Sequence, residues 1–440
     1  MSRMDSKKVH LISLGCPKNM VDSERMLGLL RGNAYEIVAD PGEAEVVVNT
    51  CGFIGPAKEE SIEAVMAAHQ LKEEGRCEGV IVTGCLAERY EKELKSELVE
   101  ADQILTIEEE SGIVGHVDRL LGNSRQRYIE SAPRVPLTPR HWAYLRISDG
   151  CDHQCAFCAI PLIKGPHRSE PVEKLVEEAR NLAGSGVREL VLVSQDSVRY
   201  GADLYGRSRL VALMQELSEI DGIEWIRLMY TYPAFWTEEM IDIYASNEKI
   251  CAYVDMPLQH ISDPVLRRMK RATTKRKTLH LLERLRSRLP AVGLRSSFIM
   301  GFPGETEEQF EELLEFVEAT RFDYVTGFLY SPEEGTSASE LDGEVPEEVK
   351  EERYRRLTQL HEEISAQINA ELIGTRQVVL VDENDEDEGV SYGRMERDAP
   401  EIDGQVVIAG GKAEAGKFVE VEITEAHPYE VSARAVGMPH

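Results

Sequence analysis

The sequence lacks any long apolar run and is short of positive charge. No stretch approaches the roughly 18 consecutive apolar residues of a membrane-spanning helix, and the N-terminus has no charged head, apolar core and cleavage site of a secretion signal. Lys and Arg number 50 against 79 Asp and Glu, a formal net charge of −29. A protein that grips a phosphate backbone normally presents a basic face, so a basic partner is favoured over nucleic acid. We expect a cytoplasmic protein without membrane association, for which RNA binding is disfavoured.

Cysteine is also scarce, with eight residues in a chain of 440. That length is sufficient for two or three domains with their own cores. The few cysteines fit a reducing compartment better than a disulfide framework. Cys77 and Cys251 have no chemically suggestive neighbours, and we interpret both as ordinary thiols. The other six fall into two groups of three.

The first group is a C-x3-C-x2-C array, Cys151, Cys155 and Cys158, which follows an apolar run and a glycine over residues 144–150. Three thiolates in one tight loop can hold three irons of a [4Fe-4S] cluster, because iron favours sulfur ligands. The fourth iron would stay open to bind a small chelating molecule. The alternative is a zinc site with His153 or His167 as fourth ligand, although zinc sites usually pair cysteines as two C-x2-C motifs.

The second group lies in the N-terminal third, where three short β-branched runs each end in a cysteine that precedes a helical pattern. The runs are residues 9–14, 46–48 and 80–82, and the cysteines are Cys16, Cys51 and Cys85. Repeated strand–loop–helix units predict a parallel α/β sheet whose strand ends meet at one edge. The three thiols are therefore expected to converge there and could hold a second [4Fe-4S] cluster. The alternative is three buried structural cysteines.

From residue 141 onward, strand-like runs alternate with helical ones. The six strand-like runs are residues 144–147, 190–193, 225–229, 253–256, 294–300 and 324–329. Six such units predict a partial (β/α)6 barrel related to the TIM barrel, with its chemistry at the carboxyl ends of the strands. Three prolines between residues 125 and 140 predict a linker in front of this barrel.

An amphipathic helix over residues 346–372 precedes a region of β-branched runs and Gly-rich turns that predicts a small antiparallel β-barrel. The domains are thus expected at residues 1–124, 141–373 and 374–440, with the linker at 125–140. The last domain holds six Lys and Arg against fifteen Asp and Glu. Such a surface repels RNA phosphates and attracts a Lys/Arg-rich protein; the alternative is an acidic module that only aids solubility.

These motifs resemble the radical S-adenosylmethionine (SAM) methylthiotransferases over essentially the whole chain. The cysteine spacing with Phe157 before the last cysteine is similar to the radical SAM loop, and the last domain looks like a TRAM domain. The resemblance implies that Cys151, Cys155 and Cys158 hold the [4Fe-4S] cluster that binds SAM and cleaves it to a radical. It further implies that the three N-terminal cysteines hold an auxiliary [4Fe-4S] cluster that carries the sulfur to be transferred.

The resemblance also implies contacts to SAM. Ser194 and Gln195 follow the second barrel strand, where superfamily members place polar groups against the methionyl amine, although the usual Gly-Gly-Glu is absent here. Gly301, Gly304 and Glu305 follow the fifth strand and resemble the stretch that packs on the adenine; a plain strand-to-helix turn is the alternative. No catalytic residue beyond these cofactor contacts is predicted.

Stretches at residues 15–19, 21–24 and 393–404 resemble the branch of the family that modifies a ribosomal protein. The implied reaction is methylthiolation of an aspartate β-carbon in the twelfth protein of the small ribosomal subunit, with two SAM molecules and a flavodoxin- or ferredoxin-like electron donor. A tRNA adenosine methylthiotransferase is the alternative, although a basic last domain would then be expected. An iron–sulfur electron carrier without a SAM pocket is a further one.

Two features stay open. Residues 267–277 hold seven basic side chains among eleven, which either form a solvated helix face or contact an acidic group of the substrate. His260 follows the fourth barrel strand, where it is either a hydrogen-bonded structural residue or a proton carrier.

Overall fold

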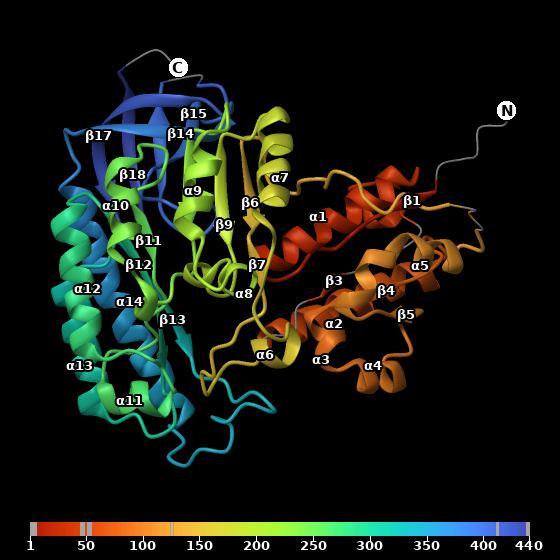
Figure 1. Ribbon diagram of the computed structural model, residues 1–440, viewed down its shortest axis with the longest axis horizontal. Helices are drawn as coiled ribbons and strands as arrows, with labels where there is room; N and C mark the ends of the chain where they lie inside the picture. The colour runs from red at the N-terminus through yellow and green to blue at the C-terminus, as the bar shows by residue number, and fades with distance from the viewer. Residues whose placement is uncertain are drawn as a thin grey trace. The chain divides into compact units, whose positions relative to one another are not determined.

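The computed structural model describes residues 7–44, 49–50, 55–123, 125, 127–410 and 413–436. The chain divides into two compact units (Figure 1). The first comprises Met1–Thr138, Gly150–Asp152 and Ala159–Pro166, and the second comprises the remaining residues. Within the described ranges, no helix combines the length and apolar character needed to cross a membrane.

The first unit is a parallel α/β structure, as predicted. Its elements are β1 Lys8–Val9, α1 Pro17–Gly32, β2 Glu36–Ile37, β3 Asn49–Thr50, α2 Gly55–Glu73, β4 Ile81–Gly84, α3 Cys85–Arg89, α4 Glu91–Glu97, β5 Gln103–Ile104, α5 Ile113–Leu120 and α6 Ile160–Ile163. β1 pairs with β2, and β4 pairs with both β3 and β5, every pair being parallel. The strand expected over residues 9–14 is shorter than predicted, because regular pairing ends at Val9. The run at 46–48 lies outside the described residues.

The predicted linker has neither helix nor strand among its described residues, yet it is anchored along α1. The Arg134 guanidinium donates to the Glu24 carboxylate at 2.8 Å, and the Leu137 amide donates to the other oxygen of that carboxylate at 2.7 Å. A Cβ on Gly28 would lie 2.5 Å from the Pro133 carbonyl oxygen, so the close approach of the segment requires glycine there.

The second unit begins with the predicted partial barrel, and all six expected strands are present. They are β6 Trp142–Arg146, β9 Glu189–Val193, β10 Trp225–Leu228, β11 Tyr253–Asp255, β12 Gly293–Met300 and β13 Tyr324–Leu329. The parallel ladders run in the orders β6–β9–β10 and β11–β12–β13. The Cys251 amide donates to the Ile226 carbonyl at 3.0 Å and the Thr231 amide donates to the Asp255 carbonyl at 2.9 Å, which links the two ladders.

Helices follow the barrel strands and cover the sheet with an apolar core. They are α7 Val172–Gly184, α9 Leu210–Ser218, α10 Glu238–Ser246, α11 Asp263–Arg268, α12 Lys275–Arg288 and α13 Glu307–Thr320. The core includes the fully buried Leu192, Leu213, Ile226 and Phe298. Two short strands, β7 Ser148–Asp149 and β8 Arg168–Ser169, flank the cysteine loop, and α8 Ala202–Tyr205 follows β9.

The predicted long helix is α14, Glu347–Ala370, and it leads into a closed barrel of five strands. These are β14 Arg376–Asp385, β15 Val390–Met395, β16 Gln405–Ala409, β17 Phe418–His427 and β18 Glu430–Ala435. Four pairings are antiparallel, as expected, but β16 and β18 run parallel. The reason is that β18 returns from β17 by a hairpin and closes the barrel on β16, which is not its neighbour in sequence.

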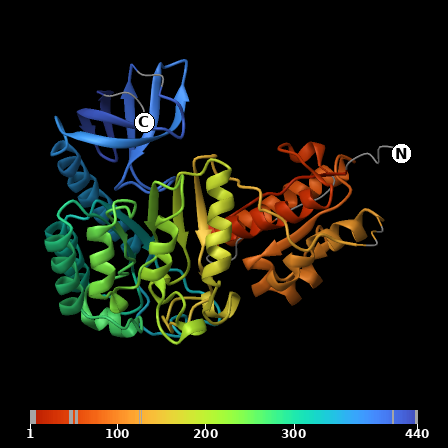
Figure 2. The same cartoon turned by 45° about the horizontal axis from the view of Figure 1, so that its top comes forward.

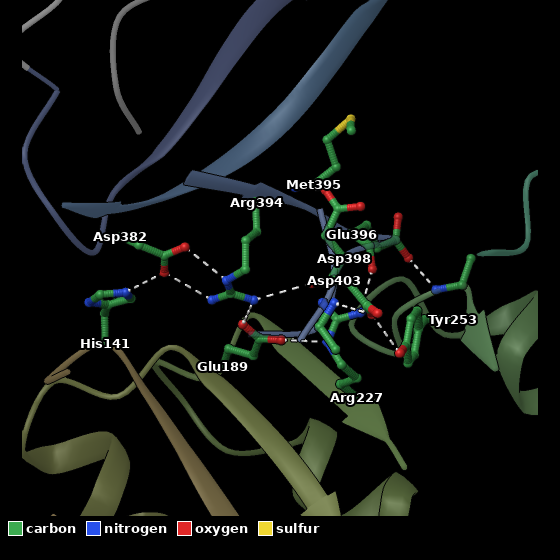
Figure 3. A network of polar contacts seen from close by, with 12 residues as sticks. His141, Glu189, Arg227, Tyr253, Asp382, Arg394, Met395, Glu396, Asp398 and Asp403 are labelled. Carbon is green, nitrogen blue, oxygen red and sulfur yellow. Dashed lines mark hydrogen bonds and ion pairs between the residues drawn. The ribbon is translucent and has the colours of Figure 1, made fainter. Parts of the chain in front are cut away.

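The closed barrel sits on the ends of the parallel strands where those strands begin (Figure 2). The Glu189 carboxylate, at the start of β9, accepts from Arg227 and from Arg394 of β15, both at 2.7 Å (Figure 3). Tyr253, at the start of β11, donates to Asp403 at 2.7 Å. Since Trp225 also packs edge-on against Phe418, the interface is both polar and aromatic. The C-terminal barrel therefore contacts the amino ends of the strands, whereas the chemistry is expected at their carboxyl ends.

Candidate active site

The cysteine loop leaves the carboxyl end of β6 through Gly150, which only glycine can occupy. Its φ is +72°, and a Cβ there would lie 2.1 Å from the Pro166 carbonyl oxygen. The Cys151 amide donates to the Gly165 carbonyl at 3.1 Å, so the start of the loop and its exit are joined by the backbone. The turn is therefore built into the local sequence.

Further along, residues 153–158 belong to the second unit and are fixed within it by backbone hydrogen bonds. The Ala156 amide donates to the Met269 carbonyl at 2.9 Å, and the Ala156 carbonyl accepts from the Ala338 amide at 2.8 Å. The Cys158 amide donates to the Cys155 carbonyl at 3.1 Å, which tightens the turn between these two cysteines. The loop is thus fixed by backbone hydrogen bonds.

The donor set fits a [4Fe-4S] cluster. Cys151, Cys155 and Cys158 are all partly exposed, and three sulfur donors within one short loop are what iron favours. Across the part of the chain that the structure describes, no group of three or more Cys, His, Asp or Glu side chains is already arranged around a metal position. Ligation by these three thiols therefore stays a prediction that rests on the chemistry of the donors.

The structure brings four side chains together at the cysteine loop, namely His153, Asp196, Tyr232 and Arg271. His153 Nε2 lies 2.7 Å from Asp196 Oδ2, and its ring stacks on Tyr232 at 4.1 Å between centroids. Arg271 lies over the same Tyr232 ring at 4.1 Å and donates to Cys155 Sγ at 3.7 Å. The sequence indicated His153 only as a possible zinc ligand and Arg271 only as a member of the basic run.

That basic run, residues 267–277, does not form a single helix face. It spans the end of α11, a turn and the start of α12. Arg268 donates to the Pro303 carbonyl at 3.0 Å, and Lys275 pairs with Glu312 at 2.8 Å, whereas Arg276 and Lys277 are exposed. The run therefore divides into solvated members and members with specific intramolecular contacts.

Gln195 supplies an observation that favours a SAM contact. Its Nε2 donates to Asp149 Oδ1 at 2.9 Å, which fixes the amide orientation. Its Oε1 is buried and has no hydrogen-bond partner among the described residues. A buried acceptor without a donor is costly unless a ligand supplies one. Ser194 is fully buried beneath, and its hydroxyl lies 3.0 Å from that of Ser197.

The loop after β12 is shaped by its glycines and by Glu305. Gly301 has φ +73°, and a Cβ there would lie 2.3 Å from Lys350 Cγ; Gly304 has φ +80°. The Glu305 carboxylate accepts from the Gly301 amide at 3.0 Å and from Arg353 of α14 at 2.8 Å. Burial raises the pKa of Glu305 to about 7. Because the Glu305 carboxylate is engaged by the Gly301 amide and by Arg353, it would contribute to a SAM site by holding the loop in shape.

His260 is placed as a structural residue. Its side chain is fully buried, its Nδ1 accepts from the Ser262 amide at 3.0 Å, and burial lowers its pKa to about 3. A histidine with so low a pKa stays neutral at physiological pH. The structure therefore favours His260 as a hydrogen-bonded structural residue over His260 as a proton carrier.

Of the N-terminal cysteines, Cys16 and Cys85 take equivalent places at the beginnings of helices. Cys16 is the N-cap residue of α1, and Cys85 opens α3 after β4. Cys85 is buried against Ala159 and Ile163, in the segment that directly follows the cysteine loop. Cys51 lies outside the described residues. Joint ligation by the three thiols therefore remains a prediction.

Family profiles match three consecutive regions of the sequence. Residues 8–106 match the Uncharacterized protein family UPF0004, residues 145–317 match the Radical SAM superfamily, and residues 373–436 match the TRAM domain.

Solved structures share the fold at low sequence identity. The radical S-adenosylmethionine methyltransferase TsrM from Kitasatospora setae superposes with a TM-score of 0.51 at 14% identity, over 86% of this chain and 79% of that one. The cobalamin-dependent S-adenosylmethionine radical enzyme OxsB gives a TM-score of 0.51 at 14% identity, over 82% of this chain and 56% of that one. This likeness shows a shared fold. The match of residues 145–317 to the Radical SAM superfamily, together with the three-cysteine loop that follows β6, defines a radical SAM enzyme, whose cofactors are [4Fe-4S] clusters and SAM.

Proteins of similar sequence identify the family within the radical SAM enzymes. Ribosomal protein uS12 methylthiotransferase RimO of Desulforamulus reducens is 46% identical, covering 96% of this chain and 98% of the relative. The proteins of the same name from Heliobacterium modesticaldum and Geobacter sulfurreducens are 45% and 44% identical, each over 98% of this chain. The chain belongs to the RimO family of radical SAM methylthiotransferases.

Proposed function

We propose that this chain methylthiolates the β-carbon of an aspartate in ribosomal protein uS12, with two SAM molecules consumed and the sulfur carried on an auxiliary cluster. The observation that carries the proposal is the three-cysteine loop at the carboxyl end of β6, in a chain that matches uS12 methylthiotransferases over nearly its whole length. Acid–base catalysis by side chains cannot break an unactivated C–H bond, so the reaction needs cofactors.

In this proposal Cys151, Cys155 and Cys158 hold one [4Fe-4S] cluster, and Cys16, Cys51 and Cys85 hold the second. When bound, the first cluster supplies the electron that cleaves SAM. The chain's own part is to place and enclose these groups. Backbone contacts at Gly150 and Ala156 fix the loop, and Phe157 packs edge-on against Phe302 in an apolar group that excludes water beside it.

Other residues orient SAM in the proposed site. Gln195 Oε1 would accept a hydrogen bond from the methionyl ammonium, which would satisfy that buried oxygen. Ser194 supports the strand end from beneath. The backbone at Gly301 and Gly304 would pack on the adenine, while the missing Cβ atoms make room for Lys350 and Arg268 and Glu305 holds the loop through the Gly301 amide.

Substrate selection is assigned to the acidic surface of the C-terminal barrel. The β14–β15 hairpin lines a hollow with Glu383, Asp385, Glu386 and Asp387 beside Tyr392. A Lys/Arg-rich ribosomal protein is attracted to this charge, whereas an RNA phosphate chain is repelled. The proposal includes a flavodoxin- or ferredoxin-like electron donor, a cytoplasmic location, and domains at residues 1–124, 141–373 and 374–440 joined by the linker at 125–140.

The test uses full-length protein reconstituted anaerobically with iron and sulfide, then supplied with SAM, sulfide and a strong reductant. uS12 and tRNA are offered in separate tubes, and products are weighed by mass spectrometry. We expect an added methylthio group on uS12, abolished by Cys155→Ala and retained by the matched Cys77→Ala. A gain on tRNA alone would make the chain a tRNA methylthiotransferase and overturn the proposed substrate.

A further inference from the structure

A stack of side chains beside the cysteine loop has no role in the function proposed so far. His153 and Arg271 both lie on the ring of Tyr232, at 4.1 Å from its centroid in each case. The stack is tied at one end to the carboxylate of Asp196, after β9, and at the other to the sulfur of Cys155. It therefore joins a strand end, the cysteine loop and the segment after α11.

Arg271 is held in one orientation by these contacts. One terminal nitrogen donates to the Pro257 carbonyl at 2.5 Å, and the other donates to Cys155 Sγ at 3.7 Å. The Tyr232 ring fixes the plane of the guanidinium. Because a guanidinium is planar and always charged, its position sets both a directed donor and a fixed positive charge at that sulfur.

The backbone on both sides of the stack is strained. Lys270, directly before Arg271, has φ +54°, and Tyr230, two residues before Tyr232, has φ +59°. A left-handed conformation costs free energy for residues other than glycine, and such residues gather where function over-determines the backbone. Lys270 reverses the chain at the end of α11, where the Arg271 amide donates to the Leu266 carbonyl at 2.9 Å, and so directs Arg271 toward the loop.

A positive charge and an N–H donor beside a ligand sulfur favour the electron-rich state of an iron–sulfur cluster. Net charge and hydrogen bonds to the sulfurs are the protein's means of setting cluster reduction potentials. Of the three cysteines in the loop, Cys155 is the one that receives this contact from Arg271.

We propose that Arg271 is a positioning residue for the cluster: it holds the Cys155 sulfur as a ligand and raises the reduction potential of the cluster bound there. This inference rests on the proposed function, since it takes Cys155 to be a cluster ligand. It assigns to Arg271 a contact with a cofactor ligand and none with the substrate.

The experiment compares Arg271→Met and Arg271→Lys with Arg276→Met in full-length protein. All carry Cys16→Ala, Cys51→Ala and Cys85→Ala, so that only the loop can hold a cluster. Arg276→Met removes the same charge by the same substitution from an exposed position of the same basic run. Iron and sulfide content are measured after anaerobic reconstitution, and the midpoint potential is measured by a redox titration followed by electron paramagnetic resonance.

We expect Arg271→Met to lower the reduced-to-oxidised ratio at a fixed potential by roughly tenfold, which for a one-electron couple is a shift of 59 mV. Arg271→Lys keeps the charge and should recover most of the shift, whereas Arg276→Met should match the parent. Lower iron and sulfide content in Arg271→Met alone, with an unchanged melting temperature, would also support the positioning role.

An unchanged midpoint potential in fully loaded Arg271→Met would overturn the inference, as would an equal shift in Arg276→Met. A lower melting temperature with an unchanged potential would reduce Arg271 to a packing residue and equally refute it. Failure of the proposed function would give a different result. The parent protein would then bind no more iron than its Cys155→Ala variant, with any residue at position 271.

Discussion

Replacing Glu189 by Gln should loosen the C-terminal barrel from the radical SAM barrel. The Glu189 carboxylate is fully buried and accepts from Arg227 and Arg394, both at 2.7 Å (Figure 3). Arg227 is fully buried as well, and Arg394 is 5% exposed. Without the shared carboxylate, Arg227 keeps the Glu396 carbonyl as a hydrogen-bond acceptor, and Arg394 keeps the Asp382 carboxylate and the Asp398 carbonyl.

The expected loss of unfolding free energy follows from the burial of the Glu189 ion pairs. Breaking a buried ion pair by removing one partner costs about 3–5 kcal/mol, because the other charge stays in a low-dielectric environment. Exposed ion pairs contribute only about 0–1 kcal/mol. Glu224 gives a matched control, since it pairs with Arg188 at 3.4 Å with its side chain 46% exposed.

The assay is equilibrium urea unfolding followed by circular dichroism and by tryptophan fluorescence, to which Trp225 contributes from its contact with Phe418. Glu189→Gln should lower the free energy of unfolding by about 3–5 kcal/mol, and Glu224→Gln by less than about 1 kcal/mol. If the two variants lost equal stability, the buried pair would not be what fastens the two barrels together.

Three further predictions concern single residues. Gln195→Leu should weaken SAM binding to the cluster-loaded protein up to about tenfold by loss of one hydrogen bond; an unchanged dissociation constant by calorimetry would remove Gln195 from the site. Burial lowers the pKa of His361 from 6.5 to about 4. Its share of stability is thus present above pH 6.5 and lost as the pH falls toward 4, so His361→Gln should flatten the fall in unfolding free energy between pH 7 and 5, by up to about 1.4 kcal/mol per pH unit; equal slopes for both proteins would contradict this. Gly301→Ala combines φ +73° with a clash against Lys350, whereas Gly206→Ala at φ +70° meets nothing within 4 Å; thermal melts should show the larger loss at Gly301, and equal losses would mean that Lys350 moves aside.

The sequence predicts the barrels because their signals are local. β-branched runs that alternate with helical patterns mark each strand of the parallel sheet, and the prolines of residues 125–140 mark a segment without regular structure. Pairing is not local, however. The parallel β16–β18 ladder and the hold of Glu24 on Arg134 depend on segments that meet only after folding.

The same distinction applies to the site. Cysteine spacing reveals the loop directly, because three cysteines fall within eight residues. The contact between Arg271 and Cys155 joins positions 116 residues apart and depends on a left-handed Lys270, which no pattern announces. Gln195 was found by its place after a strand, but its unsatisfied oxygen required the structure.

The most direct test of the central claim follows one atom. uS12 carrying deuterium on its aspartate β-carbons is incubated with the reconstituted protein, SAM, sulfide and reductant, and the 5′-deoxyadenosine released is weighed by mass spectrometry. Our account predicts deuterium in the 5′-deoxyadenosine together with a methylthio group on uS12. Methylthiolated uS12 with 5′-deoxyadenosine free of deuterium, or no modification of uS12 at all, would contradict it.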